Sequence, residues 1–509
     1  MNFNLTLPMD LTKALAPDLL LFGGAMVLML WSAFAEESAA TQRRVGLGAI
    51  VVAVLTLATV VLAGMRDLSA TPGIVAVDGF RWAADMVFLL GAIITIAVSL
   101  DYNTREGLTT AESHVLVLFA VGGMMLMVAA RDLMLLFLGI ETMSVAVYVL
   151  AGLNRRSVRS AEGALKYFLL GAFSTAFLLY GIALLYGATG TTNLQVMGDR
   201  IASLHLQDSA MLLVGVALLL VGFAFKMAAV PFHMWAPDVY EGAPTPITGF
   251  MAATVKAAAF AAFLRVWLSA LGGVYGHWHA AVWWLSAITM VVGNLVALQQ
   301  KNLKRMLAYS SIGHTGFVLV SVSAGTAQAA NAFLFYLVAY TLATMGAFAV
   351  IIALGTSSSP RERIEDYHGL WQERPGMAIA MTVFMLALLG FPIFGGMGFF
   401  AKWYVLQAAL QAAAPQTRLA VLLVLTTTVS AGYYLYVVMV MFMKPRPEGG
   451  EPLPPSTGLT RLVISASIAA ILLFGVYPDP VVRWTKSAGD IAPTVQPPAP
   501  NVAQTAVMH

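Results

Sequence analysis

Residues 222–265 read G-F-A-F-K-M-A-A-V-P-F-H-M-W-A-P-D-V-Y-E-G-A-P-T-P-I-T-G-F-M-A-A-T-V-K-A-A-A-F-A-A-F-L-R. Two apolar stretches in this segment each carry a lysine, Lys226 and Lys256, and a proline-rich loop lies between them. A lysine inside hydrocarbon costs roughly 2.5–3.5 kcal/mol even on a lenient insertion scale. Lys256 lies about 15 Å along a helix from Pro246, near the midplane of a bilayer, where a snorkelling stem does not reach the headgroups. We therefore expect these lysines to be used.

The composition is that of a polytopic membrane protein. Of 509 residues, 59% are hydrophobic and 10% are charged, whereas a soluble protein carries about 25% charged residues. A net charge of +3 does not suggest nucleic-acid binding. The chain has no cysteine, which excludes cysteine-ligated iron–sulfur clusters, thiolate chemistry and disulfides. Its histidines show no i, i+4 pair of the kind that a haem or zinc helix needs, so we expect no cofactor and no metal in this chain.

Apolar runs of spanning length predict an all-α protein with about fourteen transmembrane helices. Two of the runs are too long for one straight helix across a ~30 Å core, and each contains a helix-breaking proline, Pro231 in the first and Pro392 in the second. The predicted spans are 17–35, 45–65, 83–100, 112–130, 132–152, 161–187, 209–236, 246–270, 280–298, 302–325, 328–354, 376–411, 417–443 and 460–477.

The two interrupted runs are the seventh and the twelfth, and interrupted helices at corresponding positions of two halves are typical of inverted-repeat transporters. We therefore expect two inverted five-helix repeats, each with a broken helix. The predicted units are three N-terminal helices at 1–111, the first repeat at 112–270, the second at 271–443, a loop and C-terminal transmembrane helix at 444–486, and a disordered tail at 487–509.

The loops predict the orientation. One set of alternate loops carries about twice as many lysines and arginines as the other, and such loops face the cytoplasm. Both termini belong to the other set and are expected outside.

Five ionisable side chains fall well within predicted spans, and two histidines join them. Burial disfavours a charged ammonium and a nearby carboxylate favours it. Moving the carboxylate toward or away from a lysine would therefore switch that lysine between holding and releasing a proton. The side chains are Glu141, Lys166, Lys226, Lys256 and Lys402, with His233 and His314.

Several of these residues also have simpler interpretations. Lys166 is close enough to its helix start to snorkel, Arg265 reads as an anchor near a helix end, and a lone helix histidine is commonly a packing residue. A Na⁺ site needs converging oxygens, and Glu141 is the only predicted carboxylate far from a span end, so protons are favoured over Na⁺.

At these residues the sequence resembles the antiporter-like subunits of respiratory complex I, the proton-translocating NADH–quinone oxidoreductase. The motifs are K-M-A-A-V-P-F-H-M-W-A-P-D-V-Y-E-G-A-P-T-P-I-T-G-F-M-A at 226–252, L-G-I-E-T at 138–142, N-L-K-R-M-L-A-Y-S-S-I-G-H-T-G at 302–316 and G-F-P-I-F-G-G-M-G-F-F-A-K at 390–402. The resemblance covers nearly the whole chain. The wider family also includes subunits of multisubunit cation/proton antiporters and membrane hydrogenases.

The resemblance implies roles for the buried charges. Glu141 and Lys226 would form the input pair, Lys256 the central relay and Lys402 the exit station, while Lys166, His233 and His314 would line a hydrated axis. A lysine at 402 is typical of one subunit type, because subunit M has a glutamate there and subunit L carries a long lateral helix.

The resemblance also implies the setting. The chain would lie in a bacterial inner (plasma) membrane with both termini periplasmic, beside subunit M and small membrane subunits. NADH, FMN, iron–sulfur clusters and quinone would belong to partner subunits. The alternatives are a subunit of a stand-alone cation/proton antiporter and a membrane scaffold whose lysines only fix helix packing.

Overall fold

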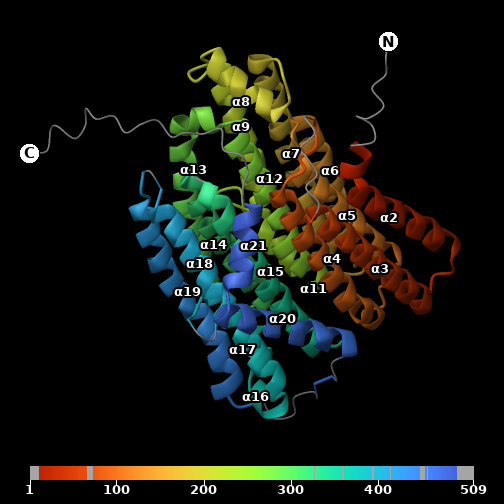
Figure 1. Ribbon diagram of the computed structural model, residues 1–509. Helices are drawn as coiled ribbons and strands as arrows, with labels where there is room; N and C mark the ends of the chain where they lie inside the picture. The colour runs from red at the N-terminus through yellow and green to blue at the C-terminus, as the bar shows by residue number, and fades with distance from the viewer. Residues whose placement is uncertain are drawn as a thin grey trace, which may run out of the picture.

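The computed structural model describes residues 11–65, 73–325, 327–357, 360–392, 395–412, 414–446, 453–454 and 457–489. Over these residues the chain folds as an all-helical bundle without strands (Figure 1). Thirteen helical segments among them are long and apolar enough to cross a membrane. They are α2 Ala16–Phe34, α3 Ala39–Gly64, α4 Gly79–Arg105, α5 Glu112–Ala129, α6 Leu133–Ala151, α7 Val158–Thr189, α9 Ala210–Met227, the continuous α11–η1–α12 segment Thr245–Ser269, α13 Tyr275–Ala297, α14 Leu303–Ser323, α15 Ala327–Leu354, α19 Thr417–Met443 and α20 Gly458–Val476.

A pair of half-helices, α17 Pro375–Leu389 and α18 Met397–Leu410, supplies one more crossing and accounts for the expected fourteen. The prediction of a break at Pro392 is confirmed, because this proline lies in the connection between them. Gly390 ends α17 with a φ of 76°, and a Cβ there would come 2.9 Å from Cδ of Lys402. Glycine therefore allows both the turn and the close approach of that lysine.

The other predicted break is also confirmed. Helix α9 ends at Met227, Ala228 takes a left-handed φ of 56°, and the chain becomes helical again only at α10, Trp235–Gly242. Pro231 lies within this interruption. Proline lacks the N–H that would continue the helix, which explains why the break falls here.

The eighth span departs from a plain α-helix, which the sequence did not predict. Helix α11, Thr245–Phe250, continues as the π-helical turn η1, Met251–Val255, and then as α12, Lys256–Ser269. The wide turn thus ends immediately before Lys256. Single π turns inside α-helices are frequent at functional sites.

Three further differences from the sequence prediction concern short or shifted helices. The polar helices α8, Leu194–Ser203, and α21, Asp479–Ala488, were missed because only apolar runs were sought. Helix α4 begins at Gly79, four residues before the expected start. The expected tail at 487–509 begins inside α21, and its residues from 490 onward lie outside the described part of the chain.

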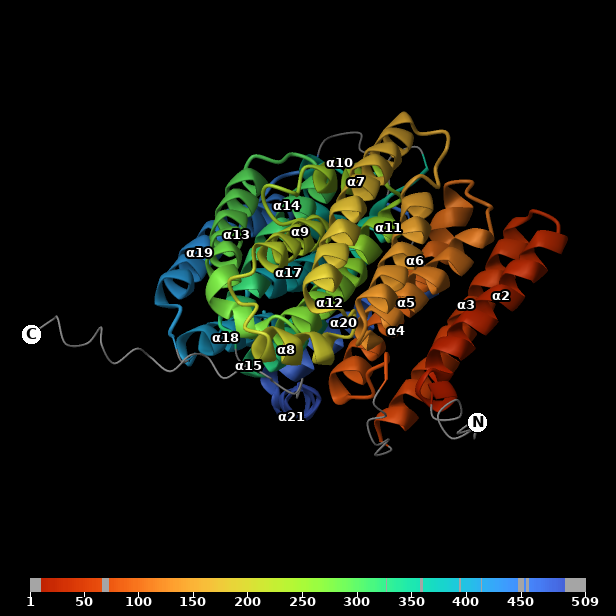
Figure 2. The same ribbon diagram turned by 90° about the horizontal axis from the view of Figure 1, so that it is seen from above.

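The helices are arranged around a long interior helix. Helices α2 and α3 lie at one edge of the bundle, and α13 and α19 lie at the opposite edge in both views (Figures 1 and 2). Helix α15 packs against α4, α14, α17, α18, α20 and α21. Helices α14 and α15 are almost wholly buried, so polar groups on them face other helices rather than lipid.

Candidate functional site

Lys226 lies on the last turn of α9 and is buried, with 6% of its surface exposed. Its ammonium donates hydrogen bonds to Oγ of Ser144 at 2.7 Å and to the hydroxyl of Tyr148 at 3.2 Å. Both partners lie on α6, and the charge also faces the ring of Tyr148. A buried ammonium needs such partners, since an unpaired charge away from water is costly.

Glu141 lies on α6, one turn before Ser144. Its Oε1 accepts a hydrogen bond of 2.9 Å from the hydroxyl of Thr175 on α7, and the side chain is partly exposed. No ion pair joins Glu141 to Lys226. The two charges are thus connected through α6 without touching, and Lys226 is held by hydroxyl groups.

Lys256 begins α12, directly after the π turn, and is 5% exposed. Its ammonium donates to the backbone oxygen of Ser311 on α14 at 2.9 Å, and also to the hydroxyl of that serine. A serine hydroxyl can accept and donate at once, so Ser311 can pass a hydrogen bond onward from the lysine.

His314 follows Ser311 by three residues on α14 and is 5% exposed. Its Nδ1 shares a hydrogen bond of 2.5 Å with the hydroxyl of Tyr336 on α15, and its Nε2 shares one of 3.1 Å with Tyr434 on α19. Tyr434 in turn bonds to the hydroxyl of Ser310. The imidazole therefore joins three helices through groups that both donate and accept.

Lys402 lies on α18 and is 7% exposed. Its ammonium donates to the backbone oxygen of Leu389 at 2.8 Å, and it lies 4.6 Å from the ring centroid of Phe317. Leu389 is the last residue of α17, whose terminal carbonyls lack helical partners. Lys402 thus caps the C-terminal end of α17, the first half of the broken helix to which this lysine belongs.

Two small cavities separate Lys256 from Lys402. One is lined by Lys256 and Thr315, the other by Lys402 and Gly398, and both share the side chains of His314, Tyr336 and Tyr340. Each has room for about one water molecule. The histidine and the two tyrosines therefore form the partition between the two lysines.

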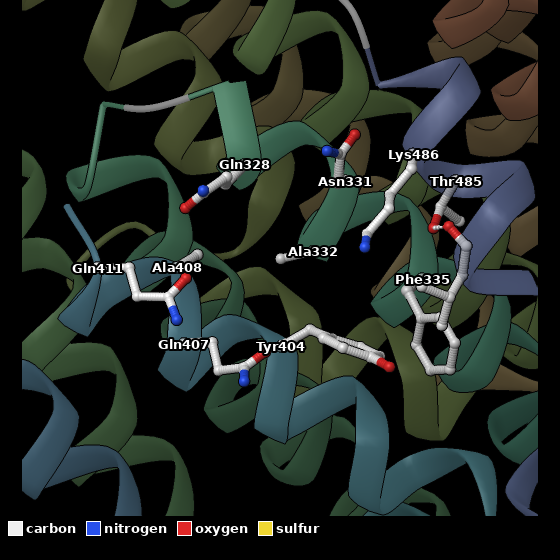
Figure 3. Close-up of a pocket in the computed structure, with 11 residues that line it drawn as sticks. Gln328, Asn331, Ala332, Phe335, Tyr404, Gln407, Ala408, Gln411, Thr485 and Lys486 are labelled. Carbon is white, nitrogen blue, oxygen red and sulfur yellow. Dashed lines mark hydrogen bonds between the residues drawn. The ribbon is translucent and has the colours of Figure 1, made fainter. Parts of the chain in front are cut away.

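A larger polar cavity lies farther along the same contact between α15 and α18 and is closed on one side by α21 (Figure 3). Amide, hydroxyl and ammonium groups line it, and Lys486 points into it. Phe335 and Tyr404, whose rings lie 5.0 Å apart, form part of its wall. Its polar residues are Gln328, Asn331, Tyr404, Gln407, Gln411, Thr485 and Lys486.

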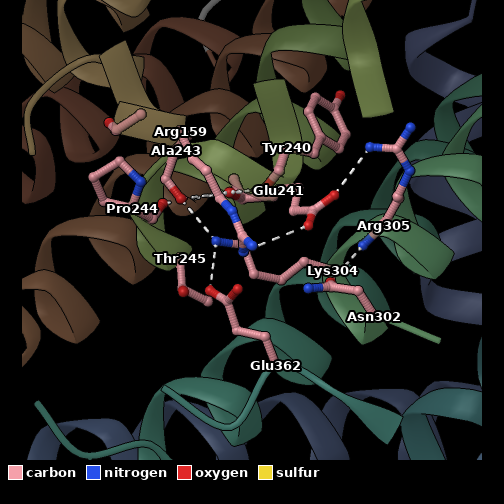
Figure 4. Close-up of polar contacts among 12 residues, drawn as sticks. Arg159, Tyr240, Glu241, Ala243, Pro244, Thr245, Asn302, Lys304, Arg305 and Glu362 are labelled. Atoms are coloured by element: carbon pink, nitrogen blue, oxygen red, sulfur yellow. Dashed lines mark hydrogen bonds and ion pairs between the residues drawn. The ribbon is translucent and has the colours of Figure 1, made fainter. Parts of the chain in front are cut away.

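The short half-helix α10 is held by ion pairs (Figure 4). Arg305 of α14 bonds to Asp238 at 2.8 Å and to Glu241 at 2.9 Å. The neighbouring Lys304, which is 2% exposed, bonds to the backbone oxygen of Ala243 at 2.8 Å and to Glu362 at 2.9 Å. Burial raises the pKa of Asp238, but hydrogen bonds from Lys166 and Arg305 outweigh burial, and the pKa lies below its ordinary value.

Within the described part of the chain, Lys166 and His233 form no hydrogen bond or ion pair with Glu141, Lys226, Lys256 or Lys402. Lys166 has a side chain 42% exposed and pairs with Glu162 at 2.7 Å and Asp238 at 2.9 Å. His233 lies in the break after α9, half-buried, and its Nδ1 has no hydrogen-bond partner among the described residues. Neither side chain hydrogen-bonds to Lys226 or Lys256.

The sequence analysis missed several polar partners and two buried carboxylates. Ser144, Tyr148, Ser311, Tyr336 and Tyr434 gave no signal, because hydroxyl-bearing residues are ordinary in membrane helices. The sequence analysis singled out Glu141 because it lies far from a span end, but Asp85 of α4 and Asp18 of α2 are more deeply buried in the bundle than the partly exposed Glu141. The late predicted start of α4 had placed Asp85 at a span edge. Within the described residues, no group of three or more His, Asp or Glu side chains is arranged to hold a metal ion.

Comparison with known proteins places this arrangement in a family. The family model described as "NADH:quinone oxidoreductase/Mrp antiporter, TM" matches residues 130–443. NADH-quinone oxidoreductase subunit N of Gemmatimonas aurantiaca is 52% identical, over 96% of this chain and 95% of that protein. The same subunit of Trichlorobacter lovleyi is 43% identical, over 81% of this chain and 84% of its own length.

Solved structures agree on the fold. A chain of respiratory complex I from Thermus thermophilus superposes with a TM-score of 0.77 at 36% identity, covering 92% of this chain and 98% of that one. A chain of the Mrp complex from Dietzia superposes with a TM-score of 0.79 at 21% identity, covering 94% and 97%, which shows the shared fold alone. The chain is an antiporter-like, multi-span membrane protein, and it belongs to the family of NADH-quinone oxidoreductase subunit N.

Proposed function

We propose that this chain is a proton-translocating membrane subunit of NADH:quinone oxidoreductase, complex I, and that protons pass along Glu141, Lys226, Lys256, His314 and Lys402. The observation that carries the proposal is the hydrogen-bonded partition between two buried lysines. Lys256 bonds to Ser311, and His314 of the same helix, with Tyr336, lines the cavities of both Lys256 and Lys402. Each side chain on this route, a carboxylate, an amine or an imidazole, can take up and release a proton.

The broken helices support the same route. An interrupted helix inside a membrane is tolerated where it lines protein or water. Each break in this chain adjoins a lysine, Lys226 at the end of α9 and Lys402 after the second break, and both lysines are buried. If the two inverted repeats span residues 112–270 and 271–443, each repeat contains one broken helix and the lysine on it, Lys226 in the first and Lys402 in the second.

The polar cavity beside α21 provides an outlet. It lies along the contact between α15 and α18, which also carries the Lys402 cavity, and its amide and hydroxyl groups can hold water. We infer that this cavity connects Lys402 to the periplasm when Phe335 and Tyr404 separate. The proposal assumes an orientation in a bacterial inner membrane with both termini on the periplasmic side. The loops rich in lysine and arginine then face the cytoplasm.

The driving energy comes from partner subunits in this proposal. The chain has no cysteine for an iron–sulfur cluster. As the resemblance to complex I implies, NADH, FMN, the clusters and quinone would belong to partner subunits. Quinone reduction would shift Glu141 relative to Lys226 and so change which lysine holds a proton. The partly exposed Glu141 is suited to respond to a neighbour such as subunit M or the small membrane subunits. Lys166 and His233 would support the route by fixing α10 and the first break.

The experiment replaces Lys226 or Glu141 by alanine in the assembled complex and measures proton uptake into vesicles per NADH oxidised. Reduced uptake with intact assembly is expected for both variants. Full uptake with both variants would overturn the proposal, and loss of assembly alone would assign these residues a structural role.

The alternative is a subunit of a multisubunit cation/proton antiporter, which the shared fold with the Mrp complex chain brings forward. The same lysines would then be driven by an ion gradient. A pull-down of the tagged chain separates the two functions. Iron and flavin that co-purify with the chain support complex I, and their absence supports the antiporter.

A further inference from the structure

A second buried charge cluster lies outside the lysine axis, where the start of α4 meets α2 and α12. It contains Asp18 of α2, Asp78, Arg81 and Asp85 at the start of α4, and Arg265 of α12. Arg81 and Asp85 are 0% exposed, and Asp18 is 2% exposed. The proposed proton route uses none of these groups.

Each arginine of the cluster donates hydrogen bonds to only one of the three carboxylates. Arg265 forms a two-pronged pair with Asp78, with distances of 2.7 and 2.8 Å. Arg81 donates from Nη2 to Oδ2 of Asp18 at 2.5 Å and from Nη1 to the backbone oxygen of Ala76 at 2.9 Å. These are charge-assisted hydrogen bonds of the strong kind.

Asp85 is left without a hydrogen bond. Both of its carboxyl oxygens are buried and have no hydrogen-bond partner among the described residues. Its nearest cation is Nε of Arg81, 3.5 Å from Oδ2, which is beyond the usual range for an N–H···O bond. The charged groups that act on Asp85 are Arg81, Asp18 and Arg265. The cluster therefore holds three carboxylates and two guanidinium groups, and Arg131 outside it also acts on Asp78.

A fully buried carboxylate that has one long ion pair and no hydrogen bond is strongly disfavoured, and a buried acid relieves the cost by taking up a proton. We propose that Asp18, Arg81 and Asp85 form a buried proton-binding site, separate from the lysine axis, that holds one proton on Asp85. With this proton the five-residue cluster is neutral. The ligand of the site is the proton itself.

The geometry assigns the proton to Asp85 rather than to Asp18. Arg81 presents Nη2 to Asp18 at 2.5 Å and Nε to Asp85 at 3.5 Å. The shorter, hydrogen-bonded contact favours the ionised form of Asp18, so the proton is held by Asp85. Where two carboxylates share one site, one of them commonly holds a proton. The fork between Arg265 and Asp78 ties the cluster to α12, the helix that begins with Lys256.

The test uses the intact complex with Asp85→Asn or Asp18→Asn in this chain. The infrared difference between wild type and Asp85→Asn at neutral pH should contain the carbonyl band of a protonated carboxylic acid, shifted in D₂O. The Asp85→Asn complex should assemble with wild-type thermal stability, because the amide resembles the neutral acid in shape and charge. Asp18→Asn should lower that stability, because it removes the charge that faces Arg81.

A carboxylate band in place of the acid band would overturn the proposal. So would an Asp85→Asn complex that fails to assemble while Asp18→Asn assembles, because Asp85 would then be the charged partner of Arg81. If neither variant assembles, Asp85→Glu decides, since it keeps the acid and must move the band. Proton uptake per NADH is not part of this readout, so the outcome is independent of the proposed lysine route.

Discussion

The ammonium of Lys256 donates a 2.9 Å hydrogen bond to the backbone oxygen of Ser311, three residues before His314 on the same helix. Lys256 follows the π turn of one span directly, and this contact connects it to α14, the helix that carries His314. The proposed route depends on this contact, because His314, the next polar residue after Ser311 on α14, lines the cavity of Lys402.

Ser311→Ala should slow proton transfer without unfolding the chain. It removes the hydroxyl contact to Lys256 but leaves the backbone contact. A hydrogen bond to a charged group contributes about 1.5–3 kcal/mol, which corresponds to about a tenfold or greater change in rate. Proton uptake in vesicles measures the effect. Ser321→Ala is the matched control, since that hydroxyl bonds within its own helix to Val318; equal losses in both variants would refute a specific role for Ser311.

Tyr336→Phe and Tyr434→Phe should not act independently. Both hydroxyls bond to the same imidazole, that of His314. Groups in one hydrogen-bond network typically show coupling of about 0.5–3 kcal/mol in a double-mutant cycle. We expect the double variant to pump more than the two single losses would predict if they were independent. Strictly additive losses would mean that the two tyrosines do not meet at His314.

The pair between Asp78 and Arg265 should make the stability of the bundle sensitive to acid. Burial raises the pKa of Asp78, but the charge and hydrogen bonds of Arg265 outweigh burial, and the pKa lies below its ordinary value. A carboxyl group with a lowered folded pKa contributes stability above its unfolded pKa and loses that contribution as pH falls through the folded pKa. The melting temperature of the wild-type complex should therefore decrease as the pH is lowered below about 4.

Asp78→Asn should lose about 3–5 kcal/mol at neutral pH, because it leaves the buried Arg265 uncompensated. Its melting temperature should then change less than that of the wild type on acidification. Asp199→Asn, at an exposed position, is the control. An unchanged melting temperature of Asp78→Asn at neutral pH would contradict the prediction.

Filling the polar cavity should slow proton release. Ala408 lies on the cavity wall (Figure 3), and Ala408→Leu would displace the water that the cavity can hold. We expect slower proton uptake and, because the two are coupled, slower NADH oxidation. Val421→Leu on the exposed face of α19 is the control. Unchanged rates in Ala408→Leu would show that protons leave elsewhere.

The breaks and the buried lysines could be predicted from the sequence because their signals are local. Pro231 and Pro392 stop a helix wherever the chain runs, and a lysine inside a long apolar run is visible without a fold. Both breaks and the count of about fourteen spans follow from such signals.

The partners of the lysines could not be predicted, because they lie far away in the sequence. Ser311 meets Lys256, and Tyr434 meets His314, only when the helices pack. Asp85 was missed for a different reason. Helix α4 starts at Gly79 with Asp78 as its cap, and a search for apolar residues passes over a start built from charges that pair with other helices.

The most direct test of the central claim is proton uptake per NADH oxidised in vesicles that contain complex I with Lys256→Met in this chain. Methionine keeps much of the volume and removes the charge between Lys226 and Lys402. The proposal predicts that the complex assembles and oxidises NADH while the number of protons taken up per NADH falls. A variant complex with the full wild-type ratio would contradict transfer through Lys256.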